Sequence, residues 1–188
     1  ELLNFCTVDL SAFYFDIRKD ALYCDSKNSD RRTGSIIVLN IILESLIKWF
    51  APILSFTTEE IYVLINKDKK SIHLEQFMQF PKSFNNEKLN EKWVELKKIR
   101  DVCNISIEAK RSSKEIGSSL EANLIISLSE KLQKITKNID FSELCITSNV
   151  KIEKNNSNEI SVATTKAEGK KCPVCWKINK DGCERHPT

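Results

Sequence analysis

The sequence of 188 residues contains a single methionine, Met78, and only two histidines, and its first residue is Glu1. The absence of a starting methionine predicts a segment of a longer polypeptide, with any catalytic centre lying upstream. No combination of serine, histidine and acid, and no pair of carboxylates, indicates a hydrolytic or acid–base centre. We therefore predict no catalytic residues in this segment, and its start lacks the pattern of a signal peptide.

Long uninterrupted apolar runs are missing too. The longest candidate, residues 35–54, is broken by polar side chains and does not approach the roughly 18 to 20 apolar residues that a membrane-spanning helix requires. The interruptions are Asn40, Glu44, Ser45 and Lys48. We therefore expect a buried helix here and no membrane partner.

The cysteines do not indicate a disulfide framework, because they are seven in number and four of them are scattered through apolar patterns. These four are Cys6, Cys24, Cys103 and Cys145. Buried cysteines that act as small hydrophobic residues are typical of a reducing compartment. We expect a cytoplasmic location.

The net charge of +3 is small, but it is unevenly placed. Basic and acidic residues are equal in number over residues 1–150, so the whole surplus lies in residues 151–188. A basic tail beside a cysteine cluster indicates a polyanionic partner, with nucleic acid as the first candidate. A solvated, lysine-rich face is the alternative.

The first half of the chain has helical patterns. Apolar residues at spacings of three and four predict a helix over residues 3–17 and another from about Ile36 to Phe50. Thr57, with Glu60 three residues later, predicts a capping box that opens a short helix through Ile65. Short links between amphipathic helices favour an antiparallel helical bundle, which would be incomplete within this chain.

The second half combines a helix with strands. A long helix is expected over residues 89–107, with Gly117 as the stop, and strict alternation over Leu120–Leu128 predicts a strand. Residues 144–152 and 160–162 predict further strands. The expected fold class is α+β: a partial antiparallel helical bundle, a small α/β unit with antiparallel strands, and a cysteine-rich tail. The predicted domains are 1–82, 83–168 and 169–188.

The tail contains two closely spaced pairs of metal ligands. Cys172-Pro-Val-Cys175 and Cys183-Glu-Arg-His186 share the same x2 spacing, and Gly182 supplies a turn before the second pair. Three thiolates and one imidazole suit tetrahedral zinc, and four protein ligands leave no open position for catalysis. A redox pair of the thioredoxin type and unrelated cysteines are the alternatives. We predict one structural zinc ion that also organises this short segment.

Several stretches resemble a known family. "NFCTVDLSAFYFDIRKDALYCD", then "RR", "WFAPILSFTTEEIY" and "KIRDVCNISIEAKRSSKEIGSSLEANLII" follow one another as in the anticodon-binding and junction segments of bacterial-type isoleucyl-tRNA synthetases. "KKCPVCW" is similar to the C-terminal zinc module of that family. Val174 stands where the family usually has arginine, and His186 where it usually has a cysteine after a longer loop.

The resemblance implies the tRNA-binding, C-terminal region of an enzyme that joins isoleucine to its tRNA with ATP and Mg²⁺. The family's "HIGH" and "KMSKS" signatures and its editing domain are absent from this segment. Isoleucine tRNA and the upstream catalytic domains of the same polypeptide are the expected partners, in a monomer. The expected RNA contacts are Trp176, Lys170, Lys171, Lys177, Arg185, Arg31 and Arg32.

The sequence leaves alternatives to these roles open. Trp176 could instead pack the zinc knuckle against the α/β unit, and Arg31 and Arg32 could form a solvated helix start. A freestanding zinc module that binds a protein partner is the alternative function.

Overall fold

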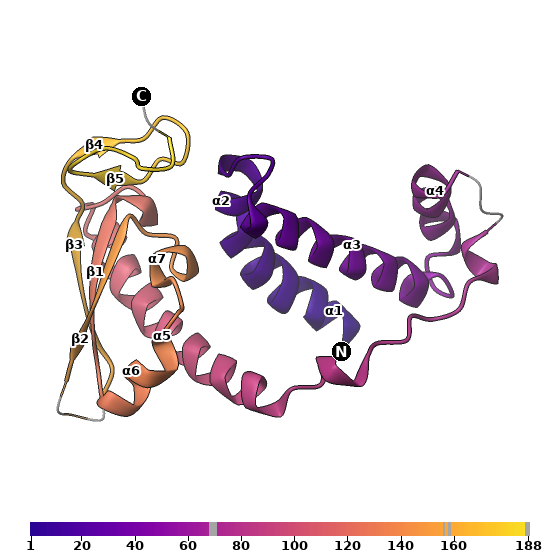
Figure 1. Ribbon diagram of the computed structural model, residues 1–188, viewed down its shortest axis with the longest axis horizontal. Coiled ribbons are helices and arrows are strands. Elements are labelled where there is room, and N and C mark those ends of the chain that lie inside the picture. The colour runs from indigo at the N-terminus through magenta and orange to yellow at the C-terminus, as the bar shows by residue number, and fades with distance from the viewer. Residues whose placement is uncertain (68–70, 156, 158, 187–188) are drawn as a thin grey trace. The chain divides into compact units, whose positions relative to one another are not determined.

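The computed structural model describes residues 1–67, 71–155, 157 and 159–186 (Figure 1). The chain divides into two compact units, here called unit 1 (Glu1–Cys24 and Asn86–Thr188) and unit 2 (Asp25–Asn85). This grouping joins residues 1–24 to the C-terminal half, whereas the sequence pattern grouped them with the helices up to residue 82. The physical reason is that Ile17 is buried in the same core as the long helix of the second half.

Unit 1 opens with a continuous helical stretch and continues into a helix-and-sheet fold. The helical stretch comprises α1 (Leu2–Asn4), η1 (Phe5–Phe15, a π-helix) and α2 (Asp16–Cys24). The later elements are α5 (Glu87–Ser112), η4 (Ser119–Glu121), β1 (Ala122–Leu128), α6 (Glu130–Thr136), α7 (Phe141–Leu144), β2 (Asn149–Lys154), β3 (Ser161–Lys166), β4 (Lys170–Lys171) and β5 (Ile178–Asn179). The predicted α+β class is confirmed.

The main sheet of unit 1 is mixed. Its strand order is β2-β1-β3, with β1 antiparallel to β3 and parallel to β2. The expectation of antiparallel strands is therefore correct for β3 and wrong for β2. Parallel neighbours need a crossover connection, and α6 and α7 supply it between β1 and β2. The apolar residues Leu144 and Ile146, expected in a strand, belong instead to the end of α7 and the turn after it.

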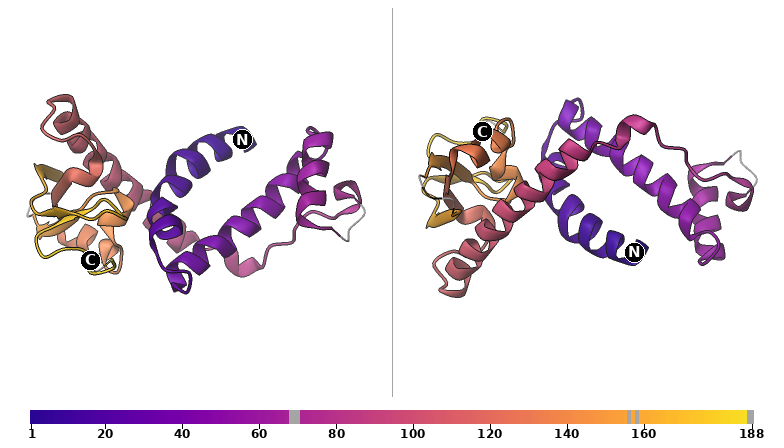
Figure 2. Two further views of the ribbon diagram at one scale, coloured as in Figure 1. Left: turned by 90° about the horizontal axis from the view of Figure 1, so that it is seen from above. Right: turned by 90° about the horizontal axis from the view of Figure 1, so that it is seen from below.

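The helix α5 lies along the sheet and supplies much of the core (Figures 1 and 2). Its predicted stop is close to the observed one, although Lys114, with φ of 60°, adopts the left-handed conformation in place of Gly117. Every second residue of β1 is buried, as the alternation predicted. The core joins Leu96, Ile99, Cys103 and Ile107 of α5 to Leu124, Ile126 and Leu128 of β1, with Phe141, Leu144, Cys145 and Ile17.

Unit 2 contains α3 (Asp30–Phe50), α4 (Ser55–Ile65), η2 (Ile72–Leu74) and η3 (Lys82–Phe84). Its buried cluster is small, with Ile47, Ala51, Tyr62 and Ile72 as members. The two helices were expected from sequence, but α4 begins at Ser55 and no side chain caps it, so the predicted capping box at Thr57 is wrong. The turn after α3, in which Leu54 N–H donates to Phe50 C=O, already starts the next helix before Thr57.

The helix α3 corrects the expectation of a buried helix over residues 35–54. Only a few of its side chains are buried, because within the described part of unit 2 only α4 and the short connector pack against it. By length and composition alone, α3 could cross a membrane. The polar interruptions therefore do not exclude a membrane-spanning helix, contrary to the expectation from the sequence. Lys48, one of those interruptions, pairs with Glu44 at 2.8 Å and lies 3.7 Å from Glu75.

The burial pattern of α5 generates a stability test. Leu96 is fully buried, whereas Ile105 on the same helix is 70% exposed. Truncating a buried leucine removes transfer free energy and leaves a cavity, so Leu96→Ala should destabilise unit 1 by about 2–5 kcal/mol. Ile105→Ala should change the free energy of unfolding by less than about 0.5 kcal/mol. Urea unfolding followed by circular dichroism measures both variants, and equal destabilisation by the two would contradict the packing described for α5.

Candidate metal centre

The cysteine-rich tail is folded by a short hairpin and two tight turns. β4 pairs with β5 through Lys170↔Asn179 and Lys171↔Ile178, so the first cysteine pair lies within the hairpin loop (Figure 1). Gly169, with φ of 127°, precedes the hairpin, and a Cβ there would collide with the backbone across from it. A glycine is therefore required at this approach of the two strands.

The first turn brings Cys172 and Cys175 together. The backbone N–H of Trp176 donates to Cys172 C=O at 3.0 Å, and Cys172 N–H donates to Lys177 C=O at 2.9 Å. The second turn is closed by His186 N–H donating to Cys183 C=O at 3.2 Å. These turns place the four candidate ligand side chains on one side of the tail.

The four ligand atoms have the spacing of a tetrahedral site. All lie within 4.8 Å of one another. Cys175 Sγ is 3.7 Å from Cys183 Sγ, while His186 Nδ1 is 3.5 Å from Cys172 Sγ and 3.3 Å from Cys183 Sγ. Bonds of about 2.3 Å to sulfur and about 2.0–2.1 Å to nitrogen in a regular tetrahedron require S···S edges of about 3.8 Å and S···N edges of about 3.6 Å. The residues present therefore fit a metal ion of zinc size.

The metal-free thiols differ in their affinity for protons. Burial raises the pKa of Cys172, but hydrogen bonds from the backbone N–H groups of Cys175 and Val174, and then from the neighbouring thiols, outweigh it and lower the pKa to about 6. Burial, together with the thiols of Cys172 and Cys183, raises the pKa of Cys175 to about 11. A bound metal cation would replace the protons on these thiols, because metal ligation requires deprotonated cysteine.

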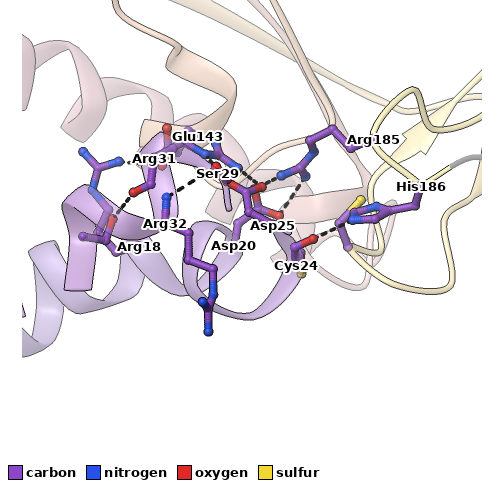
Figure 3. A network of polar contacts seen from close by, with 12 residues as sticks. Arg18, Asp20, Cys24, Asp25, Ser29, Arg31, Arg32, Glu143, Arg185 and His186 are labelled. Atoms are coloured by element: carbon purple, nitrogen blue, oxygen red, sulfur yellow. Dashed lines mark hydrogen bonds and ion pairs between the residues drawn. The ribbon is translucent and has the colours of Figure 1, made fainter. Parts of the chain in front are cut away.

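The imidazole of His186 is oriented by a contact on its other side. Its Nε2 lies 2.7 Å from the carbonyl oxygen of Cys24, at the end of α2 (Figure 3). That hydrogen bond raises the pKa of His186, with burial acting in the opposite direction. An Nε2–H group that donates to the carbonyl leaves Nδ1 as the atom with a free lone pair, facing the thiols.

Next to the ligands lies a cavity of about 370 Å³ with mainly apolar walls. The helix α2 and the tail both contribute to its lining, which includes Tyr23, Ile146, Val174, Cys175 and Trp176. Trp176 is 58% exposed, so most of its ring is available to a partner. Its φ of 62° is uncommon for a residue with a side chain. The turn closed by the first cysteine pair imposes this conformation.

The predicted RNA contacts of the tail fall into two groups. Lys170 and Lys171 are exposed and form no ion pair within the part of the chain that the structure describes, and Lys171 Nζ lies 5.9 Å from the centre of the Trp176 ring. Lys177 Nζ donates to Ser142 Oγ at 3.0 Å. Arg185 donates to both carboxylate oxygens of Asp20, at 2.8 and 2.9 Å (Figure 3).

Arg31 and Arg32 belong to unit 2, so the structure does not group them with the tail. The guanidinium of Arg31 donates to both oxygens of Asp25, at 2.7 and 2.6 Å. Ser29 caps α3 by accepting from the backbone N–H of Arg32 at 3.4 Å. The charge of Arg31 is therefore already paired with a carboxylate.

The residues of α2 that contact the tail were not predicted from the sequence. Asp20 and Cys24 of α2 are separated from their partners Arg185 and His186 by 165 and 162 positions. No motif or spacing signals pairs so far apart. Among the described residues, the tail holds the one group of His, Cys, Asp and Glu close enough to bind a metal ion.

Comparison with known proteins gives a family match over most of the chain. The model of the family described as "Anticodon-binding domain of tRNA ligase" matches residues 1–126. The chain is 75% identical to the isoleucine–tRNA ligase of Pelagibacter ubique. The 186 aligned residues make up 99% of this chain and 21% of that protein. The chain is 39% identical over 191 residues to the isoleucine–tRNA ligase of Bartonella henselae, covering 96% of the chain and 20% of that protein. The chain thus spans about a fifth of the length of these relatives.

The geometry of the four ligands predicts how metal content responds to substitution. Purified chain should contain about one divalent metal ion per molecule, and Cys172→Ser and Cys183→Ser should each lose it, because removing one thiolate opens the tetrahedral site. Cys24→Ser is the matched control, since its thiol lies 3.6 Å from Val174 C=O and is not among the ligand atoms. Elemental analysis measures all three. Retention of metal by Cys183→Ser, or its loss from Cys24→Ser, would show that the ligand set is different.

Proposed function

Because the chain belongs to the family of anticodon-binding domains of tRNA ligases, we propose that it is the tRNA-binding region of an isoleucine–tRNA ligase. The observation that carries this proposal is the combination of the family match with 75% identity over nearly the whole chain. The alternative, a freestanding zinc module for protein binding, is not favoured, since the matched residues 1–126 lie outside the metal cluster.

The whole enzyme would attach isoleucine to its tRNA in the cytoplasm. Its catalytic and editing domains would lie in the remaining four fifths of the polypeptide, where ATP and Mg²⁺ would act. Isoleucine tRNA and those domains would be the partners of this region, in a monomeric enzyme with no membrane partner. The contribution of this segment is to bind and orient the RNA.

One structural zinc ion would be held by Cys172, Cys175, Cys183 and His186. Three soft thiolates and an imidazole are a donor set that zinc favours, and the Sγ···Sγ and Sγ···Nδ1 distances of 3.3–3.7 Å support a tetrahedral ion. Bound zinc would supply folding free energy to a segment too polar to fold alone. With four protein ligands, no position remains for substrate.

The RNA contact would be made by Trp176 and the lysines beside it. Anticodon bases are recognised as single-stranded bases that stack on aromatic rings, while lysines contact the phosphates. Trp176 is more than half exposed on a turn fixed by two metal ligands, and Lys171 lies beside its ring. Lys170 and Lys171 have charges available for phosphates. Lys177, Arg185, Arg31 and Arg32 would contribute where RNA competes with the partners they now have.

The exposed ring of Trp176 predicts a stacking contribution. A base stacked on an aromatic side chain contributes about 1–3 kcal/mol, so Trp176→Ala should weaken binding of isoleucine tRNA roughly five- to more than a hundredfold. Trp176→Phe should recover part of the affinity because a flat ring remains. Filter binding gives the affinities, and elemental analysis of the same samples gives the metal content.

Two outcomes of that experiment would show that Trp176 is structural. One is loss of metal from Trp176→Ala, which would mean that the ring stabilises the turn that contains Cys172 and Cys175. The other is unchanged RNA affinity in a variant that keeps its metal. Full metal content with weakened binding is the result that stacking predicts.

The lysines predict a change in salt dependence. Replacing Lys170 and Lys171 together with alanine should weaken tRNA binding regardless of sequence. The slope of log affinity against log salt should fall by up to about one unit for each phosphate that the variant no longer neutralises. Lys180→Ala is the matched control, because its ammonium pairs with Glu168 at 3.3 Å and the residue lies in the same tail. An unchanged slope for the double variant would mean that Lys170 and Lys171 contact only solvent.

A further inference from the structure

The two ligand pairs of the metal centre are attached to different parts of unit 1. The first pair is continuous with the hairpin, whose strand β5 is fixed to the α/β fold. Ile178 N–H donates to Ser148 Oγ at 2.6 Å, and Asn149 Nδ2 donates to Ile178 C=O at 3.3 Å. Lys177 adds its bond to Ser142, at the start of α7. The first pair is therefore held by residues around β2 and α7.

The second pair is attached to the helix α2. His186 Nε2 contacts the Cys24 carbonyl at 2.7 Å, and Arg185 forms a bidentate ion pair with Asp20, at 2.8 and 2.9 Å (Figure 3). Both contacts fall in the last turn of α2, where the carbonyl groups of a helix have no partner within it. Arg185 is also a cation at the negative end of the helix dipole, which is a favourable position.

The last turn of α2 makes few buried apolar contacts with the rest of unit 1. Upstream in α2, Ile17 lies in the main core and Arg18 pairs with Glu143 at 2.8 Å. Beyond them, Ala21 is the one buried side chain of residues 20–24, whereas Tyr23 is 82% exposed and Cys24 lines the 370 Å³ cavity. A segment with few buried apolar contacts opens locally at low free-energy cost. The polar contacts to Arg185 and His186, and a weak one from the Cys24 thiol to Val174 C=O at 3.6 Å, connect this turn to the tail.

We propose that the metal ion acts as a staple, joining the last turn of α2 (Asp20–Cys24) to the α/β fold of unit 1. The ion would tie Cys172 and Cys175, on the α/β side, to Cys183 and His186, on the α2 side. His186 is suited to this role because an imidazole binds metal through one nitrogen and donates through the other, whereas a cysteine ligand has no second donor. Asp20 and the Cys24 carbonyl are then positioning groups for the second pair. The inference rests on the proposed metal site.

Hydrogen–deuterium exchange tests the staple on the full 188-residue chain, with zinc bound and after chelation. Removing zinc should speed exchange of the amides of residues 20–24 by about tenfold or more, together with those of 172–186. The amides of β1 (Ala122–Leu128) should keep their protection and serve as the internal reference. Faster exchange confined to 172–186 would overturn the staple.

Two variants separate the staple from metal binding itself. His186→Cys keeps four ligands but removes the donor to Cys24, and Asp20→Asn removes one charge of the ion pair with Arg185. Each should retain about one zinc per chain while residues 20–24 exchange several-fold faster. Asp16→Asn is the control, because Asp16 pairs with Lys19 at 2.9 Å within α2 and should leave this exchange unchanged.

The outcomes distinguish the staple from the function on which it rests. Wild-type exchange in both His186→Cys and Asp20→Asn, with zinc retained, would overturn the staple and leave the metal site standing. Chain without stoichiometric metal would overturn both, and elemental analysis identifies that case before exchange is measured. Binding of isoleucine tRNA is measured separately and is not needed for either result.

Discussion

The convergence of four ligand atoms within 4.8 Å is the constraint on which the structure of the tail depends. Among the described residues from 170 to 186, only Cys172 and Cys175 are buried, so this stretch has almost no apolar core to offset the conformational entropy that ordering removes. A bound metal ion would supply the missing free energy. The strained backbone of Trp176 and the positions of the lysines beside it follow from the turn that the ion would hold.

Only some of the basic side chains of the tail are available to bind RNA. Arg185 pairs with Asp20, and Lys177 donates to Ser142, whereas Lys170 and Lys171 have no carboxylate partner in the described residues. Lys171 Nζ lies 5.9 Å from the centre of the exposed Trp176 ring. An aromatic platform with neighbouring cations is the combination that single-stranded RNA requires. Family membership gives this surface its context, because the matched region precedes the cluster and belongs to a family of anticodon-binding domains.

The sequence was most informative where the deciding residues are close together in it. Alternation over β1 and the x2 spacing of the ligand pairs are local patterns, and the structure has the strand and the clustered side chains. Alternation cannot distinguish parallel from antiparallel pairing, and the apolar residues Leu144 and Ile146 imitate a strand while belonging to the crossover. The partners of Arg185 and His186 lie more than 160 positions away, so only the fold reveals them.

The central proposal is that the metal-ordered tail contributes to binding the anticodon stem-loop of isoleucine tRNA. The most direct test compares the affinity of zinc-loaded and chelated chain for isoleucine tRNA and for the same tRNA with its anticodon stem-loop removed. We predict that the zinc-loaded chain prefers the intact tRNA by about tenfold or more, and that chelation removes the preference while leaving weak, salt-dependent binding. An identical preference with and without zinc, or no preference with zinc bound, would contradict it.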